Sequence, residues 1–484
     1  MNRIARPLYL CLLIPIALFA QSLATPQNAN ADDRPNIVVL LCDDLGYGDI
    51  QCYGHPHIKT PNLDRLADGG IRFTDFYSAA PVCSPSRVGL LTGRSPNRAG
   101  VYDWIPESSA PQPDRRDQVH MQADEVTIPM LLKQAGYATC MAGKWHCNSQ
   151  FNSAEQPQPG DFGFDHWLAT QNNASPSHDS PKNFVRNGTP IGNTDEFSCQ
   201  IVVDEAIDWL QSADKSQPFF LYAAFHEPHE PVASPQSLVN QYRDVAVNEN
   251  EAQYFANVTN VDIAVGRLVD SLETLELREN TLIIFTSDNG PETLNRYPNA
   301  KRSYGRPGPL RGMKLHTTDA GFRVAGIINW PAKIQAGQIS TTPLSSLDFL
   351  PTFCSLAGVT PPEDLKLDGV SFSTWLDGES FVRSKPLVWA YYNAINEARV
   401  AMRDGKWKVL AKLDSGDFPK LQNVTRKSAA MLAKAKLTDI EIYDISKDIG
   451  ETNNLASENP EFTETMTQKL RTQYQELLDG SHVW

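Results

Sequence analysis

The sequence predicts an α/β protein in which a large mixed sheet carries helices on both faces, followed by a smaller C-terminal α+β subdomain. Three features lead to this prediction. Short apolar runs recur along most of the chain, and amphipathic segments at helical spacing alternate with them. After residue 380 the pattern changes to shorter, closely spaced strand signals. Alternation of strands and helices is typical of layered α/β domains, and 484 residues provide ample material for one large core.

Five apolar runs are predicted to be buried strands. They are near-continuous rather than alternating, which indicates that both faces of each strand are covered. The runs are residues 36–42, 137–142, 218–225, 281–286 and 322–329.

Helix signals lie between these runs. Pro61 stands at the first helical position after Thr60, and Gly69 ends that helix. Residues 198–210 and 251–275 carry apolar side chains at helical spacing. One face of the longer segment is formed by Tyr254, Val258, Val261, Val265, Leu268 and Leu272.

The C-terminal part of the chain predicts a small antiparallel sheet and a final helix. Asp404-Gly405 is a turn signal between two strands. Pro460 opens a helix that runs to Leu478, with Asn459 as its N-cap. The expected strands are residues 400–402, 407–410 and 440–443.

The first 24 residues are predicted to be a secretory signal peptide. Arg3 and Arg6 precede the apolar residues 8–20, and Ser22-Leu23-Ala24 offers a small-residue cleavage site. The apolar run is too short to span a bilayer comfortably, so cleavage is favoured over an uncleaved anchor, and no stable membrane insertion is expected. We therefore expect a secreted or periplasmic protein. The expected units are 1–24 (signal peptide), 32–380 (catalytic domain) and 381–484 (C-terminal subdomain).

Charge and cysteine usage limit the partners. The net charge is −14, which argues against nucleic acid, so any anion site has to be locally positive. Eight cysteines are present, and Cys11 lies in the leader. Apart from Cys83, the other six are compatible with disulfides in an oxidising compartment or with buried thiols.

Oxygen ligands follow two of the predicted strands. Asp43-Asp44 ends the first, and Asp288-Asn289 ends the strand at residues 281–286. Ligands in α/β sheets sit beyond the carboxyl ends of strands. Three carboxylates and an amide suit a hard cation, Ca²⁺ or Mg²⁺, although each such ending taken alone is more often a turn or helix cap.

A second constellation surrounds Cys83. Pro85 indicates a helix start there, so Cys83 lies at the helix N-terminus, where the dipole favours an anion. Arg87 follows four residues later, on the same face. An isolated cysteine is usually a small buried hydrophobe, but the proline and the arginine together favour a reactive site.

These motifs resemble those of the type I sulfatases, in the alkaline-phosphatase-like superfamily. Cys83-Ser84-Pro85-Ser86-Arg87 with Thr92-Gly93-Arg94 is similar to the family signature, and the resemblance covers nearly the whole mature chain. Further matching motifs, in family order, are Asp43-Asp44-Leu45-Gly46-Tyr47-Gly48-Asp49, Gly143-Lys144-Trp145-His146, Pro228-His229-Glu230-Pro231, Ser287-Asp288-Asn289-Gly290, Leu310-Arg311-Gly312-Met313-Lys314, Glu441-Ile442-Tyr443-Asp444 and Glu451-Thr452-Asn453-Asn454-Leu455.

The resemblance implies a cofactor pair. Cys83 would be oxidised by a maturation enzyme to formylglycine (3-oxoalanine), whose hydrate is the nucleophile. One calcium ion would be held by Asp43, Asp44, Asp288, Asn289 and the modified Cys83. Such a hydrate combines covalent catalysis with a built-in release step.

The resemblance also implies roles for cations and histidines. Arg87 and Lys144 would steady the hydrate, and Lys314 would grip the sulfate. His146 would be the base that regenerates the aldehyde, and His229 would protonate or orient the leaving oxygen. Preplaced cations suit the charge that develops in such a reaction, and histidine suits acid–base work near neutral pH.

Specificity is harder to assign from sequence. Arg311, with Lys301, Arg302 and Arg306, forms a basic run that either binds an anionic sugar or is simply solvated. His316 is unusual for the family and is a candidate substrate contact, as is His226 near the preferred His229. The segment 171–188, rich in Asn, Ser and Pro, is expected to be a specificity loop.

The leading interpretation is a sulfuric ester hydrolase that acts on a sulfated carbohydrate. One alternative is a phosphonate or phosphodiester hydrolase of the same superfamily, some of which share the cysteine signature. A second is a non-catalytic binder of sulfated glycans, expected if Cys83 stays a thiol. The complete set of metal and catalytic candidates argues against the second alternative.

Overall fold

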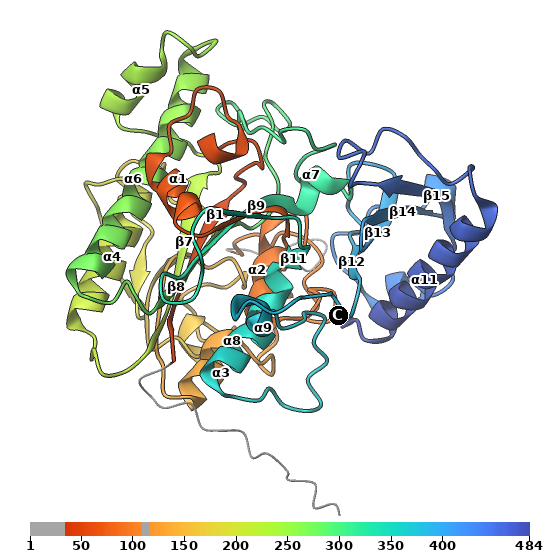
Figure 1. Ribbon diagram of the computed structural model, residues 1–484, viewed down its shortest axis with the longest axis horizontal. Coiled ribbons are helices and arrows are strands. Elements are labelled where there is room, and N and C mark those ends of the chain that lie inside the picture. The colour runs from red at the N-terminus through yellow and green to blue at the C-terminus, as the bar shows by residue number, and fades with distance from the viewer. Residues whose placement is uncertain (1–33, 109–115) are drawn as a thin grey trace, which may run out of the picture.

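The computed structural model describes residues 34–108 and 116–484. The predicted leader, residues 1–24, lies outside the described residues. Two sheets organise the rest: a large one that carries the candidate site and a small one near the C-terminus, at the right of Figure 1.

Eleven strands of the described residues form the large sheet, in the order β10-β2-β9-β8-β1-β7-β3-β4-β5-β6, with β11 paired to β2. The strands are β1 (Asn36–Asp43), β2 (Ile71–Tyr77), β3 (Ala138–Lys144), β4 (His166–Thr170), β5 (Val185–Arg186), β6 (Thr189–Pro190), β7 (Phe219–Pro228), β8 (Thr281–Ser287), β9 (Arg323–Asn329), β10 (Gln338–Ser340) and β11 (Leu344–Ser345).

The sheet is mixed, as the sequence predicts. The central strands β8, β1, β7, β3 and β4 are parallel. Strand β9 runs antiparallel to both β8 and β2. The five predicted strands are β1, β3, β7, β8 and β9, and all five form the middle of the sheet.

Both faces of the sheet are covered by helices (Figure 1). Val38 and Leu40 of β1 belong to one apolar layer, and Val39 and Leu41 belong to the other, because successive strand side chains alternate between faces. The first layer contains α1 (Pro61–Asp68), α4 (Ser198–Ser212), α5 (Gln236–Tyr242) and α6 (Glu249–Thr274). The second contains α2 (Cys83–Thr92), α3 (Ile128–Gln134), α8 (Phe349–Ala357) and α9 (Ser373–Leu376).

The small sheet is antiparallel, in the order β12-β13-β14-β15. Its strands are β12 (Leu387–Ala390), β13 (Ala398–Asp404), β14 (Trp407–Leu413) and β15 (Leu437–Asp444). Helix α11 (Pro460–Asp479) packs on this sheet, and Asn459 caps it by accepting from the Phe462 N–H, as predicted. The short helix α10 (Arg426–Leu432) lies between β14 and β15 in the chain.

A buried ionic cluster joins the two sheets. Lys408 of β14 places Nζ 2.6 Å from Oδ1 of Asp319, the first residue of α7 (Asp319–Phe322). Arg403 of β13 contacts Asp75 of β2 at 2.9 Å, and Arg323 contacts both Asp75 and Asp319 at 3.1 Å. Since all five side chains are buried, these pairs hold the small sheet at a defined place on the large one.

Two sequence expectations can be compared with the described residues. The seven cysteines there are all free, and six of them are buried, whereas Cys52 is half-buried. None of the helices described is both long and apolar enough to cross a membrane.

Candidate active site

The polar ends of β1 and β8 meet at one edge of the sheet. These strands are parallel neighbours, with Cys42 opposite Ser287. The Asp288 N–H donates to the Cys42 carbonyl at 3.0 Å. The Asn289 amide donates to Asp44 Oδ1 at 2.7 Å. Asp43, Asp44, Asp288 and Asn289, predicted as one ligand set, are therefore brought together and buried.

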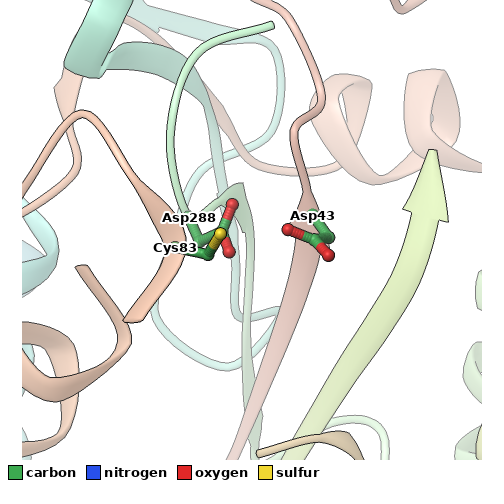
Figure 2. A group of neighbouring side chains, drawn as sticks. All are labelled: Asp43, Cys83 and Asp288. Atoms are coloured by element: carbon green, nitrogen blue, oxygen red, sulfur yellow. The ribbon is translucent and has the colours of Figure 1, made fainter. Parts of the chain in front are cut away.

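Cys83 reaches the same place from the second helix layer. It is the first residue of α2, after the extended Val82. Figure 2 shows its sulfur and the carboxylates of Asp43 and Asp288 gathered from three separate segments. One ligand atom from each lies within 4.8 Å of the others. This group has the geometry of a candidate metal site.

Three buried cations surround these acids. Arg87 donates through Nε to Asp288 Oδ2 at 2.9 Å and through Nη1 to the Lys144 carbonyl at 2.9 Å. Lys144 Nζ lies 2.5 Å from Asp43 Oδ2. Lys314 Nζ lies 2.7 Å from Asp44. The predicted cations thus all lie beside predicted ligands.

Two buried oxygen atoms of this cluster have no hydrogen-bond partner, and one of its carboxylates resists ionisation. Burial raises the pKa of Asp288 to about 7, with Arg87 opposing and Asp43 adding to the rise. Burial would raise the pKa of Asp43 too, but Lys144 leads the cations that hold it well below its usual range. Oδ1 of Asp43 and Oδ1 of Asn289 are buried without a hydrogen-bond partner. Unpaired buried oxygens next to a carboxylate that resists ionisation fit a hard divalent cation.

Two histidines of the predicted site are each held through one ring nitrogen. His146 Nε2 lies 2.9 Å from the Ile105 carbonyl, so Nε2 carries the proton, and Nδ1 is buried without a partner. His229 Nδ1 lies 2.6 Å from the Glu230 carbonyl, which leaves Nε2 facing Asp44 Oδ2 at 3.5 Å. Each ring is thus fixed by a backbone carbonyl.

Comparison with known proteins decides the family. The sulfatase family model matches residues 35–359, about two thirds of the chain. The chain belongs to the sulfatase family. A second family model, the C-terminal region of N-sulphoglucosamine sulphohydrolase, matches residues 314–479.

Named relatives agree with this assignment. Human arylsulfatase A is 34% identical over 468 residues, covering 90% of this chain and 86% of the relative. Human N-acetylgalactosamine-6-sulfatase is 34% identical over 362 residues, covering 71% of this chain and 66% of the relative. Among solved structures, Ps i-CgsB in complex with k-i-k-neocarrahexaose is 26% identical, with a TM-score of 0.76 over 93% of this chain and 94% of that one. The chain is therefore a sulfuric ester hydrolase by family.

In this sulfatase-family chain, the three residues predicted as substrate contacts, Arg311, His316 and His226, have hydrogen-bond partners outside the predicted ligand set. Arg311 points toward the small sheet, with Nη1 at 3.0 Å from the Tyr443 hydroxyl. His316 Nδ1 lies 3.2 Å from the Met313 carbonyl. His226 is buried, with Nε2 at 2.8 Å from Thr170 Oγ1.

The predicted basic run is also largely turned onto the protein. Arg302 donates through Nη1 to the Val232 carbonyl at 2.5 Å, and Arg306 Nη2 lies 3.4 Å from Glu251 Oε1. Lys301 is exposed. In the segment 171–188, the predicted specificity loop, the Gln171 amide donates to the Asn148 carbonyl at 2.7 Å. His178 of this segment is buried.

Sequence reasoning missed two side chains near the site. Tyr391, after β12, packs in one apolar cluster with Cys83 and donates to Asp103 Oδ1 at 2.8 Å. Arg296 lies in a segment whose first residue, Pro291, is hydrogen-bonded to Lys314. No local pattern marks Tyr391, whereas Arg296 was recognisable only as another cation in a basic region.

Proposed function

We propose that this protein hydrolyses a sulfate ester of a sulfated carbohydrate, with Cys83 converted to formylglycine and a calcium ion held beside it. The observation that carries the proposal is the buried cluster of Asp43, Asp288 and Cys83 with cations on every acid. Such a site can hold an anion only because its charges are arranged in advance, since the chain as a whole is acidic.

An unmodified Cys83 is poorly suited to the reaction. Burial raises the pKa of its thiol to about 11. The thiol therefore stays protonated at neutral pH and is a weak nucleophile. This supports oxidation by a maturation enzyme, the partner that the family resemblance implies.

Asp43, Asp44, Asp288, Asn289 and the modified residue 83 would hold the calcium ion. Together the hydrated aldehyde and the ion supply an attacking hydroxyl and a positive charge next to it. The unpaired Oδ1 atoms of Asp43 and Asn289 are buried oxygen ligands that fit a calcium ion. Ca²⁺ rather than Mg²⁺ follows from the family, not from these contacts.

The chain's own cations then bind and orient the ester. Lys144 lies against Asp43 and Lys314 lies against Asp44, so the sulfate oxygens would be bound by their ammonium groups. Arg87 is locked to Asp288 and to the Lys144 carbonyl, so it keeps both the acid and the strand end in place. Preplaced donors of this kind stabilise charge without reorganisation.

The histidines would move protons at defined atoms. His146 has a free lone pair on Nδ1 and would accept the proton that releases sulfate. His229 would offer Nε2 to the leaving oxygen of the sugar. A bound sulfate ester adds negative charge beside Nε2, which favours the protonated ring.

A carbohydrate substrate is proposed from the relatives. One similar structure is a complex with k-i-k-neocarrahexaose, and one relative is an N-acetylgalactosamine-6-sulfatase.

We further propose that residues 1–24 direct secretion, to the periplasm or beyond. The boundary between residues 380 and 381, which falls between α9 and β12, would separate the catalytic domain (32–380) from the C-terminal subdomain (381–484).

One experiment tests the activity and its alternatives. Protein from its native host is assayed with 4-nitrophenyl sulfate, 4-nitrophenyl phosphate and bis(4-nitrophenyl) phosphate. The mass of the peptide that carries residue 83 is measured by mass spectrometry. Faster turnover of the sulfate ester, with loss of sulfur and gain of an aldehyde oxygen, supports the proposal. Faster turnover of either phosphate would reassign the chemistry. An unmodified thiol without turnover would leave a glycan-binding role.

A further inference from the structure

The segment from Pro291 to Arg302 bridges two parts of the candidate site. At its start, the Lys314 N–H donates to the Pro291 carbonyl at 3.0 Å. At its end, the Arg302 N–H donates to Glu230 Oε1 at 2.5 Å, and Glu230 follows His229 directly. Both ends of the segment are therefore held beside residues whose side chains face Asp44, namely Lys314 and His229.

Arg296, in the middle of this segment, is held in one orientation. Its Nε and Nη2 contact the two carboxylate oxygens of Glu292 at 2.6 and 2.5 Å. Glu292 is 3% exposed, whereas the Arg296 side chain is 25% exposed. The guanidinium also lies over the Tyr297 ring, 5.0 Å from its centroid. Within the described residues the Nη1 hydrogens make no hydrogen bond, so one edge of the guanidinium is open to a ligand.

Charges of the site act on this pair of side chains. Burial opposes the charge of Arg296, but its hydrogen bonds to Glu292 and the charge of Asp44 raise its pKa. Burial raises the pKa of Tyr297, and Lys314 is the leading influence that lowers it. Arg296 and Tyr297 are therefore within electrostatic reach of Asp44 and Lys314.

We propose that Arg296, positioned by Glu292, determines specificity by binding a second anionic group on the sugar whose sulfate ester is cleaved. This inference rests on the proposed function. The second group is a sulfate or a carboxylate, because a guanidinium edge matches two oxygens of a planar or tetrahedral anion. Because the buried Glu292 carboxylate already holds Arg296 in one orientation, Arg296 loses little conformational entropy when it binds the anion. The preferred substrate is then a sugar with two anionic substituents.

The test compares matched sugars on matched variants. Mono- and disulfated forms of galactose, N-acetylgalactosamine and glucosamine are measured by calorimetric binding and as inhibitors of 4-nitrophenyl sulfate turnover. We expect the wild type to bind at least one disulfated sugar about 10-fold or more tightly than its monosulfated form, the factor for one charged hydrogen-bond pair. Arg296→Ala removes this ratio. Lys301→Ala, which deletes an exposed cation of the same segment, keeps it.

Two further variants separate recognition from structure. Arg296→Lys keeps the positive charge but not the two parallel N–H donors of the guanidinium. The ratio of the affinities for disulfated and monosulfated sugar therefore falls without vanishing. Glu292→Gln keeps Arg296 but loosens it, with the same expected direction. The proposal is overturned if wild-type protein shows no preference for any disulfated sugar, or if the preference survives in Arg296→Ala. The calorimetric measurement does not depend on turnover of 4-nitrophenyl sulfate, so failure to hydrolyse any sulfate ester would reject the proposed function while the binding data still test Arg296.

Discussion

Lys144 Nζ lies 2.5 Å from Asp43 Oδ2, and neither side chain is exposed to solvent. The two residues are 101 positions apart and come from the ends of β3 and β1, which are both neighbours of β7. In an ion pair buried this completely, the charge of each residue depends strongly on the other. Removing one partner leaves an unpaired charge in a site with low dielectric.

Replacing Lys144 with methionine should therefore lower stability as well as impair catalysis, because Asp43 loses its nearest counter-charge. We expect kcat to fall about 100- to 1,000-fold, the usual cost of one preplaced donor at developing charge. The measurement is kcat for 4-nitrophenyl sulfate, with the melting temperature as a fold check. Lys133→Met, which removes a half-exposed lysine paired with Asp165, is the matched control. A kcat within a few-fold of wild type would contradict the role proposed for Lys144.

Metal removal should lower both activity and stability. A ligand bound only to the folded state at about 100 times its Kd contributes about 2.7 kcal/mol. Thermal melts with chelator and with added Ca²⁺ measure this contribution. In Asp288→Asn, the calcium-dependent shift should largely disappear because a ligand is weakened. An equal shift in wild type and variant would place the ion elsewhere.

The cluster of Glu205, Arg186 and His166 predicts a pH dependence of stability. Burial would raise the pKa of Glu205, but hydrogen bonds from His166 and Arg186 lower it to about 2. The folded state therefore favours the carboxylate. Its stabilisation is present above the unfolded pKa of about 4.3 and is lost as the pH falls toward 2.

Glu205→Gln should lose this dependence. Because Arg186 is half exposed, we expect only about 1 to 2 kcal/mol, measured as the difference in unfolding free energy between wild type and variant at pH 7. The difference should shrink steadily between about pH 5 and pH 3. A difference that is unchanged over this range would show that the hydrogen-bond geometry, not the charge, matters.

The cluster around Lys408 predicts a large stability effect. Its ammonium pairs with Asp319 at 2.6 Å and with Glu451 at 3.6 Å, all fully buried side chains. Lys408→Met should cost about 3 to 5 kcal/mol, because it removes the counter-charge of Glu451 and leaves Asp319 paired with Arg323 alone. Lys406→Met, which removes a half-exposed lysine paired with Asp444, should cost no more than about 1 kcal/mol. Similar melting temperatures for both variants would contradict this.

The central strands were predictable because their residues are buried on both sides. Near-continuous apolar runs such as residues 281–286 have few alternative structures. Strand β2 (Ile71–Tyr77) was not predicted, since Arg72, Thr74 and Asp75 interrupt its apolar pattern. Asp75 is buried there only because Arg323 and Arg403 approach from other elements. Strands β5 and β6, at one end of the sheet, are too short to leave a pattern.

The sequence by itself determined which chemical groups the site contains. Asp43-Asp44, Cys83-Ser84-Pro85-Ser86-Arg87 and Asp288-Asn289 are local motifs, and each can be recognised without knowing where the others lie. The order of the central strands was not accessible in this way. It follows from pairings between residues that are far apart in the chain, such as Cys42 with Ser287.

Only the tertiary structure decided which cation serves which acid and which side chains face the site. It directed Arg311 to Tyr443, buried His226 against Thr170, and clamped Arg296 to Glu292 beside Lys314. The orientation of these side chains depends on long-range contacts that satisfy buried charge, and a local pattern carries no information about those contacts.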